Sequence, residues 1–267
     1  MTDALRLYGR LVAVSLRAQM QYRASFLMAA AGHFLITVLD FFALWALFAR
    51  FGSLPGWTLP EVAVLYGMIN VSFAIAEAGA RSFDTFGHMV RDGEFDRVLL
   101  RPRSTVLQLA GRELQLMRLG RLSQGLLVLL WALTQLPTPP GPAQLVLLLA
   151  AIGGGACLFA GLFVLQATMA FWTVETLELV NTVTYGGVET GQYPLSIYGR
   201  WFRWFFTIVV PLAGANYLPG LAILARPIPG GWPGLLCWLA PLSGVAFLAI
   251  ALQAWRFGVR HYLSTGS

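Results

Sequence analysis

Six polar side chains stand inside otherwise apolar stretches of the sequence, where their chemistry would be unusual. They are His33, Asp40, Asn70, Glu77, Gln166 and Asn216. Polar and ionisable groups are costly to bury in a membrane, so they are candidates for a translocation path, a proton relay or interhelical hydrogen bonds. Thr37 shares one helical face with His33 and Asp40 by its spacing. We expect this face to line a path or to make polar contacts with a neighbouring helix, and we favour the second.

The common catalytic and metal-binding patterns are missing from the sequence. All 18 residues in the lysine and arginine class are arginine, whereas a phosphate-binding GxxxxGK[ST] loop requires lysine. His33, His88 and His261 are scattered, and neither HExxH nor GxSxG occurs. The two cysteines, Cys157 and Cys237, lie in apolar runs without a ligand-forming neighbour. We therefore expect no catalytic residue, no metal and no cofactor in this chain.

Six apolar runs must position the polar residues. The chain is 57% hydrophobic and 11% charged, against about 25% charged in soluble domains. The runs cover 26–48, 62–80, 119–136, 145–172, 204–224 and 235–255, and most approach the roughly 20 residues that cross a bilayer. Pro211 and Pro219 interrupt the fifth run, so its second half is expected to be re-entrant or to lie on the outer surface. Three glycines at 153–155 indicate helix flexibility or close helix packing rather than phosphate binding.

This pattern predicts an all-α, polytopic membrane protein whose six transmembrane helices form a single domain over 1–267. Of the 18 arginines, 16 fall in the N-terminal segment, in 81–121, beside Trp201 or at the C-terminus. By the positive-inside rule, both termini and the segments 81–118 and 173–203 are then cytoplasmic, in a multi-pass protein of the cell (cytoplasmic, or inner) membrane. Because the arginines flank apolar runs, the net charge of +6 does not indicate nucleic-acid binding.

Residues 1–24 are expected to form an amphipathic helix in the membrane interface, in contact with the lipid bilayer. Arg6, Arg10 and Arg17 fall on one side of a helix, at 100° per residue, and apolar residues occupy the rest. The alternative is a solvated beginning of the first span.

Three segments carry a resemblance to a known family. RDGEFDRVLLRP at 91–102, FWTVETLELVN at 171–181 and QYPLSIYGRWFRWFFTIVVPLAGANYLPGLAIL at 192–224 resemble the permease subunits of ABC type-2 exporters, in the branch with six spans and no fused ATPase. The resemblance implies a permease that pairs with a second copy or a related permease. ATP would be bound and hydrolysed by separate ATPase subunits. The exported substrate would be a drug, an antibiotic, a lipid or a polysaccharide.

The resemblance also implies that the ATPase binds a short coupling helix within 81–92. The sequence predicts that this helix ends near Asp92 and Gly93. The apolar residues Phe83, Phe86 and Val90 are spaced to form one face, and Asp84, His88 and Arg91 offer polar contacts. We expect the apolar face to dock the ATPase. The alternative is that this helix folds back on the bundle or lies in the lipid interface.

Two other functions stay open from the sequence. A proton-coupled secondary transporter would use Asp40 and Glu77, although that class usually shows paired broken helices, and here only the fifth run is clearly interrupted. A non-transporting membrane scaffold is the second. A neighbouring reading frame with a lysine-containing phosphate loop would favour the exporter.

Overall fold

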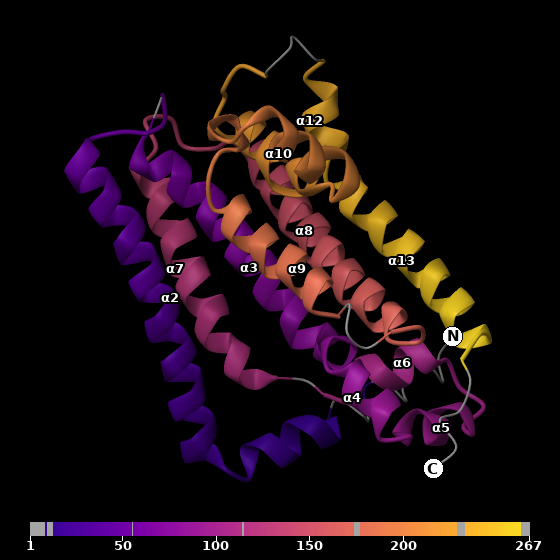
Figure 1. The fold of residues 1–267 in the computed structure, drawn as a ribbon. Coiled ribbons are helices and arrows are strands. Elements are labelled where there is room, and N and C mark those ends of the chain that lie inside the picture. The colour runs from indigo at the N-terminus through magenta and orange to yellow at the C-terminus, as the bar shows by residue number, and fades with distance from the viewer. Residues whose placement is uncertain are drawn as a thin grey trace.

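The computed structural model describes residues 9, 13–54, 56–113, 115–173, 177–228 and 233–262, and this part of the chain is a bundle of helices without a β-strand (Figure 1). The helices are α2 (Arg23–Phe51), α3 (Leu59–Asp84), α4 (Phe86–Arg91), α5 (Glu94–Leu99), α6 (Thr105–Ala110), η1 (Leu116–Arg118), α7 (Leu119–Gln135), α8 (Pro142–Met169), α9 (Leu177–Gly191), η2 (Leu195–Ile197), α10 (Arg200–Trp204), η3 (Phe205–Val209), η4 (Ala213–Tyr217), α11 (Leu218–Ile223), α12 (Leu235–Leu239) and α13 (Leu242–Arg260).

Five of the described helical stretches are long and apolar enough to cross a membrane. They are Arg23–Phe51, Leu59–Arg91, Leu116–Gln135, Pro142–Met169 and Leu242–Arg260. A sixth candidate is a bent pair, Arg200–Val209 and Ala213–Ile223, whose halves meet at 84°. The bend lies at Pro211, which interrupts the helix as the sequence predicted. The prediction of an all-α, polytopic membrane protein is confirmed.

Helix α3 forms the centre of the bundle and α2 its edge. In the most apolar 18-residue stretch of the span that contains α3, 78% of the residues are buried, against 17% in α2. α3 packs on α7 and α8, while α2 packs mainly on α7. Helix α3 begins with a capping box in which Glu61 bonds the backbone N–H of Thr58 at 2.8 Å. We call the end of the bundle where α3 begins the α11 end, and the other the α4–α6 end.

Helices α8 and α13 run in the same direction. Gly154 of α8 lies against the backbone of Gly244 in α13. Further along both helices, Gly161 lies against Leu248, and Thr168 lies against Gly258. The contact at Gly154 has no room for a side chain, and Gly155 packs in the same way on Ser72 of α3, so close packing explains these two glycines of the 153–155 cluster but not Gly153, which has nothing within 4 Å. Since both helices run toward the α4–α6 end, the chain between them must cross the bundle in the opposite direction.

Helix α9 and the bent pair make this crossing together. The hydroxyl of Tyr185 in α9 lies 3.4 Å from Arg81 near the end of α3, and Gly191 packs on Ile69 further along α3. The bent pair then reaches the α11 end, where the carbonyls of Ala222 and Ile223 accept hydrogen bonds from Gln144, in the first turn of α8.

The prediction that all of 173–203 lies on the same side as 81–118 is therefore wrong. Helix α9 runs back along α3 and α8, and α10 lies at the α11 end together with α12 (Figure 1). Residues 174–176 lie outside the described residues. Arg200 and Arg203 move to the opposite end, so twelve of the sixteen described arginines remain at the α4–α6 end.

The predicted interfacial helix of 1–24 is only partly described. Residues 1–8 and 10–12, which include Arg6 and Arg10, lie outside the described residues. Residues 13–20 are helical, and a turn at Gln21 and Tyr22 separates them from α2, so this segment points away from the α2 axis (Figure 1). The side chain of Gln19 accepts a hydrogen bond from the backbone N–H of Leu116 at 3.0 Å, which fixes the segment at the α4–α6 end.

Candidate functional site: a coupling segment packed on a buried ion network

The chain between α3 and η1 folds into three short helices. Helix α4 ends at Arg91, where the sequence predicted an end, and Gly93 takes a left-handed conformation with φ of 68° before α5 begins. Glycine adopts this conformation without a steric penalty. Helix α5 ends at Leu99, and Pro102 disfavours a helical conformation of Arg101, so the helix could not have continued beyond Leu100.

An aromatic cluster fastens this segment to the bundle. Its members are Phe86, Phe95, Phe171, Trp255 and Tyr262. The ring of Phe86 lies 4.9 Å from the rings of both Phe95 and Trp255, in edge-to-face geometry that adds about 1 kcal/mol a pair beyond burial. The indole N–H of Trp255 donates to the Thr105 hydroxyl at 3.1 Å. The cluster therefore joins α4, α5 and α6 to α13 and to the end of α8.

The expected docking face of the coupling helix is buried within the chain itself. Phe83, Phe86 and Val90 have exposed fractions of 3%, 0% and 6%. The prediction that this face is free to receive the ATPase is wrong, and the alternative, a helix folded back on the bundle, describes the structure. The three residues do form one apolar face, but the side chains that cover it come from α5 and α13 of the same chain.

The opposite side of α4 is polar and exposed. His88, Arg91 and Asp92 follow one another at i, i+3 and i+4 on this side. Beside them a groove of about 320 Å³ opens between α4 and α9, with Glu178 in its lining. Asp84 also lines this groove, although its carboxylate is largely covered and already engaged.

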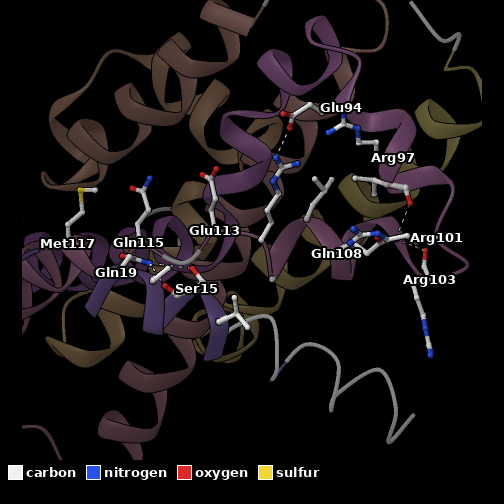
Figure 2. Close-up of a pocket in the computed structure, with 16 residues that line it drawn as sticks. Ser15, Gln19, Glu94, Arg97, Arg101, Arg103, Gln108, Glu113, Gln115 and Met117 are labelled. Atoms are coloured by element: carbon white, nitrogen blue, oxygen red, sulfur yellow. Dashed lines mark hydrogen bonds and ion pairs between the residues drawn. The ribbon is translucent and has the colours of Figure 1, made fainter. Parts of the chain in front are cut away.

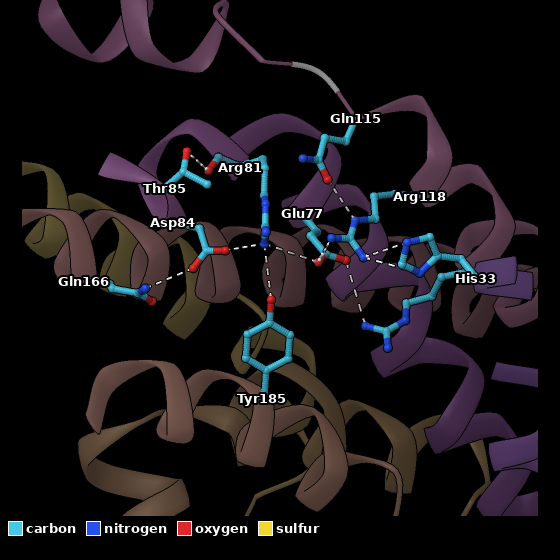
Figure 3. A network of polar contacts seen from close by, with 10 residues as sticks. His33, Glu77, Arg81, Asp84, Thr85, Gln115, Arg118, Gln166 and Tyr185 are labelled. Carbon is cyan, nitrogen blue, oxygen red and sulfur yellow. Dashed lines mark hydrogen bonds and ion pairs between the residues drawn. The ribbon is translucent and has the colours of Figure 1, made fainter. Parts of the chain in front are cut away.

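A buried ion network lies directly above this segment, centred on Glu77 (Figure 3). The Glu77 side chain is 1% exposed, and a carboxylate oxygen lies 2.9 Å from the guanidinium of Arg118. Arg81 and Arg121 approach the same carboxylate at 3.9 and 4.0 Å. These contacts are ion pairs rather than aligned hydrogen bonds, since neither oxygen of Glu77 receives a hydrogen bond from the described residues.

A second arm of the network runs from Arg81 to the other side of α3. Arg81 pairs with Asp84, and its guanidinium also lies 3.4 Å from the hydroxyl of Tyr185 in α9. Asp84 accepts a hydrogen bond from the side-chain amide of Gln166 in α8 at 2.9 Å. Figure 3 shows these side chains converging from helices that are far apart in sequence.

The network links α2, α3, η1, α7, α8 and α9 and carries an excess positive charge. Three arginines face two carboxylates, and His33 of α2 lies 3.4 Å from Arg118. Burying such charges is expensive, and their attraction offsets that cost only while every partner is in place. The arrangement can therefore act as a latch between the helices. It offers no metal site, because no group of three metal-ligating side chains occurs among the described residues.

The structure brings together only part of the predicted polar set. His33 and Glu77 both contact Arg118. Asn70 is 1% exposed and donates to the carbonyl of Tyr66, four residues earlier, which makes it an intrahelical contact. Asp40 is exposed on α2 and lies apart from this network. His33 and Asp40, which were predicted to share one polar face of α2, therefore have different surroundings.

The residues that complete the network were not identified as a site from the sequence. Arg118 and Arg121 were used only as markers of membrane topology. Their i, i+3 spacing at the beginning of an apolar run was the available signal, since two arginines on one helical face there require anionic partners. Tyr185 carried no signal, because its role depends on how α9 packs.

The fold defines a polytopic membrane protein. Residues 34–266 match the family model of the ABC-2 family transporter proteins, and the chain belongs to this family. No curated protein and no solved structure matches the chain.

Proposed function

We propose that this chain is the membrane-spanning permease subunit of an ABC exporter and that a separate ATPase subunit hydrolyses the ATP. Membership of the ABC-2 transporter family supports the permease assignment. The absence of lysine supports a separate ATPase, because this chain has no phosphate-binding loop of the usual kind.

The ATPase docks on the exposed polar edge of α4, formed by His88, Arg91 and Asp92. The supporting observation is the aromatic cluster, which fastens the other side of α4 to α13 and to the end of α8. A displacement of α4 is therefore transmitted to two spanning helices, whereas a freely exposed apolar face would have had no such connection.

The α4–α6 end faces the cytoplasm, and a second permease packs beside α2. Twelve of the sixteen described arginines at the α4–α6 end support this orientation. Asp40 lies near the middle of α2 with its side chain exposed, between exposed apolar residues such as Leu39 and Phe42. A carboxylate at that depth requires a polar path or a partner subunit rather than lipid.

Co-purification in mild detergent tests the docking surface. The chain is co-expressed with a candidate ABC ATPase subunit, and the double variant H88E/R91E is compared with R256E/R260E, which changes charges at the same end on α13. We expect the α4 variant to recover at least tenfold less ATPase, with unchanged insertion, and the α13 variant to behave like the native chain. Equal ATPase recovery with H88E/R91E would refute the docking surface.

A further inference from the structure

A second and larger groove lies on the other side of the coupling segment and reaches the ion network at Gln115, which accepts a hydrogen bond from Arg118. Figure 2 shows it between the helical segment 13–20 and the chain from α5 to η1. Its volume is about 920 Å³, within the range of sites that hold small molecules. It does not share a lining residue with the groove beside α4.

Arginine dominates the charged lining of this groove. Arg97, Arg101, Arg103 and Arg112 line it together with Glu94 and Glu113, which gives a formal excess of two positive charges. Arg112 pairs with Glu94 and holds the pKa of that carboxyl below its ordinary value. The other three arginines are exposed and have no acidic side chain within 4.0 Å among the described residues.

The remaining wall combines the polar side chains of Ser15, Gln19, Gln108 and Gln115 with an apolar strip. The strip includes Val14, of which 65% is exposed, Val98 and Leu109 at the base, and Met117. A free phosphate would satisfy the arginines but would leave this apolar strip in water. A ligand with a phosphate group and an attached hydrocarbon chain would satisfy both.

The groove also adjoins the ends of two spanning helices. The segment 13–20 leads directly into the spanning helix α2, and Met117 leads into α7. Tyr22, between the two helical segments, is 74% exposed, which is typical of the interfacial position of this amphipathic side chain. Phospholipid headgroups are therefore the phosphates within reach.

We propose that this groove binds an anionic glycerophospholipid, with its phosphate on Arg97, Arg101 and Arg103 and the beginning of an acyl chain along Val14 and Met117. The lipid joins the segment 13–20 to the coupling segment, in addition to the hydrogen bond from Leu116 to Gln19. An arginine near an anionic lipid surface strengthens binding by about fivefold, so the three together account for about a hundredfold.

Thermal unfolding of the delipidated, purified chain in detergent tests the proposal. Phosphatidylglycerol is titrated into the native chain and into two triple variants, R97A/R101A/R103A in the groove and R91A/R256A/R260A outside it. Phosphatidylcholine and inorganic phosphate are titrated in parallel. The Tm of each variant without lipid shows that it is folded, which is expected because all six arginines are exposed.

We expect phosphatidylglycerol alone to raise the Tm, with an apparent Kd about a hundredfold weaker in the groove variant and within about threefold of native in the other. If both triple variants bound phosphatidylglycerol equally weakly, the lipid effect would come from the general surface charge, and the proposed site would be wrong. Equal stabilisation by inorganic phosphate or by phosphatidylcholine would also overturn it.

The ATPase itself is the other candidate occupant, since an acidic protein surface would also fit arginines. A groove variant that keeps its affinity for phosphatidylglycerol but loses the co-purified ATPase would assign the groove to that partner. Because the titration uses the chain alone, failure of the proposed ATPase docking on α4 leaves the lipid result readable.

Discussion

Replacing Glu77 with glutamine is the most direct perturbation of the ion network. The change removes one charge and keeps the shape of the side chain. At an effective dielectric constant of about 20, the 2.9 Å pair with Arg118 is worth about 6 kcal/mol before desolvation, and the longer pairs with Arg81 and Arg121 about 4 kcal/mol each. Most of this attraction is cancelled by the cost of removing the charges from water.

Without the Glu77 charge that desolvation cost remains, so we expect a loss of about 3 kcal/mol in the free energy of unfolding. This is the lower end of the range for breaking a buried pair, because Arg118, Arg121 and Arg81 keep exposed fractions of 13%, 17% and 21%. Unfolding by SDS in mixed micelles measures the change. The double variant E77Q/R118Q should lose about 1–3 kcal/mol less than the two single losses added together.

A matched control is Glu94→Gln, which breaks an ion pair of the same kind with Arg112 where both side chains are more than 40% exposed. Its unfolding should match that of the native chain within the error of the measurement. If E77Q unfolds like E94Q, or if E77Q and R118Q are simply additive, the network is not a latch and the reasoning from burial fails.

Two further predictions concern α8 and α2. G154A should lower the free energy of unfolding in detergent by about 1–3 kcal/mol, since its new Cβ would press on the backbone of Pro241. The control G153A should cause no loss, because nothing lies within 4 Å of a Cβ at that position. Equal effects of the two variants would contradict the close packing of α8 on α13. D40N should keep ATP-driven export within a few-fold of native in a reconstituted transport assay, and complete loss of coupled proton movement would instead favour the secondary transporter.

The sequence predicted the spanning helices well wherever an apolar run was long and uninterrupted. The run at 26–48 became α2 at Arg23–Phe51, and the bend at Pro211 was placed correctly. Helix α9 was missed because Glu178, Asn181 and Glu189 give it the composition of a connection. Its place beside α3 and α8 depends on tertiary packing, which a window of sequence does not contain.

The site was harder to predict than the fold. The spacing of Phe83, Phe86 and Val90 correctly indicated an apolar face, but periodicity does not say what covers a face. The covering side chain Trp255 lies near the other end of the chain. Likewise, the sequence indicates a role of Arg118 in membrane topology but does not indicate its ion pair with Glu77. That pair depends on the packing of α3 beside α7.

The edge position of α2 has a consequence for motion. Lipid tails are as apolar as leucine, so a spanning helix that leaves its neighbours for lipid loses little hydrophobic energy. The resistance of α2 to a hinge movement then comes from its close packing on α7 at Gly120 and from a few polar attachments, chiefly the bond from the Tyr66 hydroxyl to the Thr37 carbonyl at 2.9 Å and the contact of His33 with Arg118. Helix α3 has no such freedom, because its displacement would strand the buried charge of Glu77.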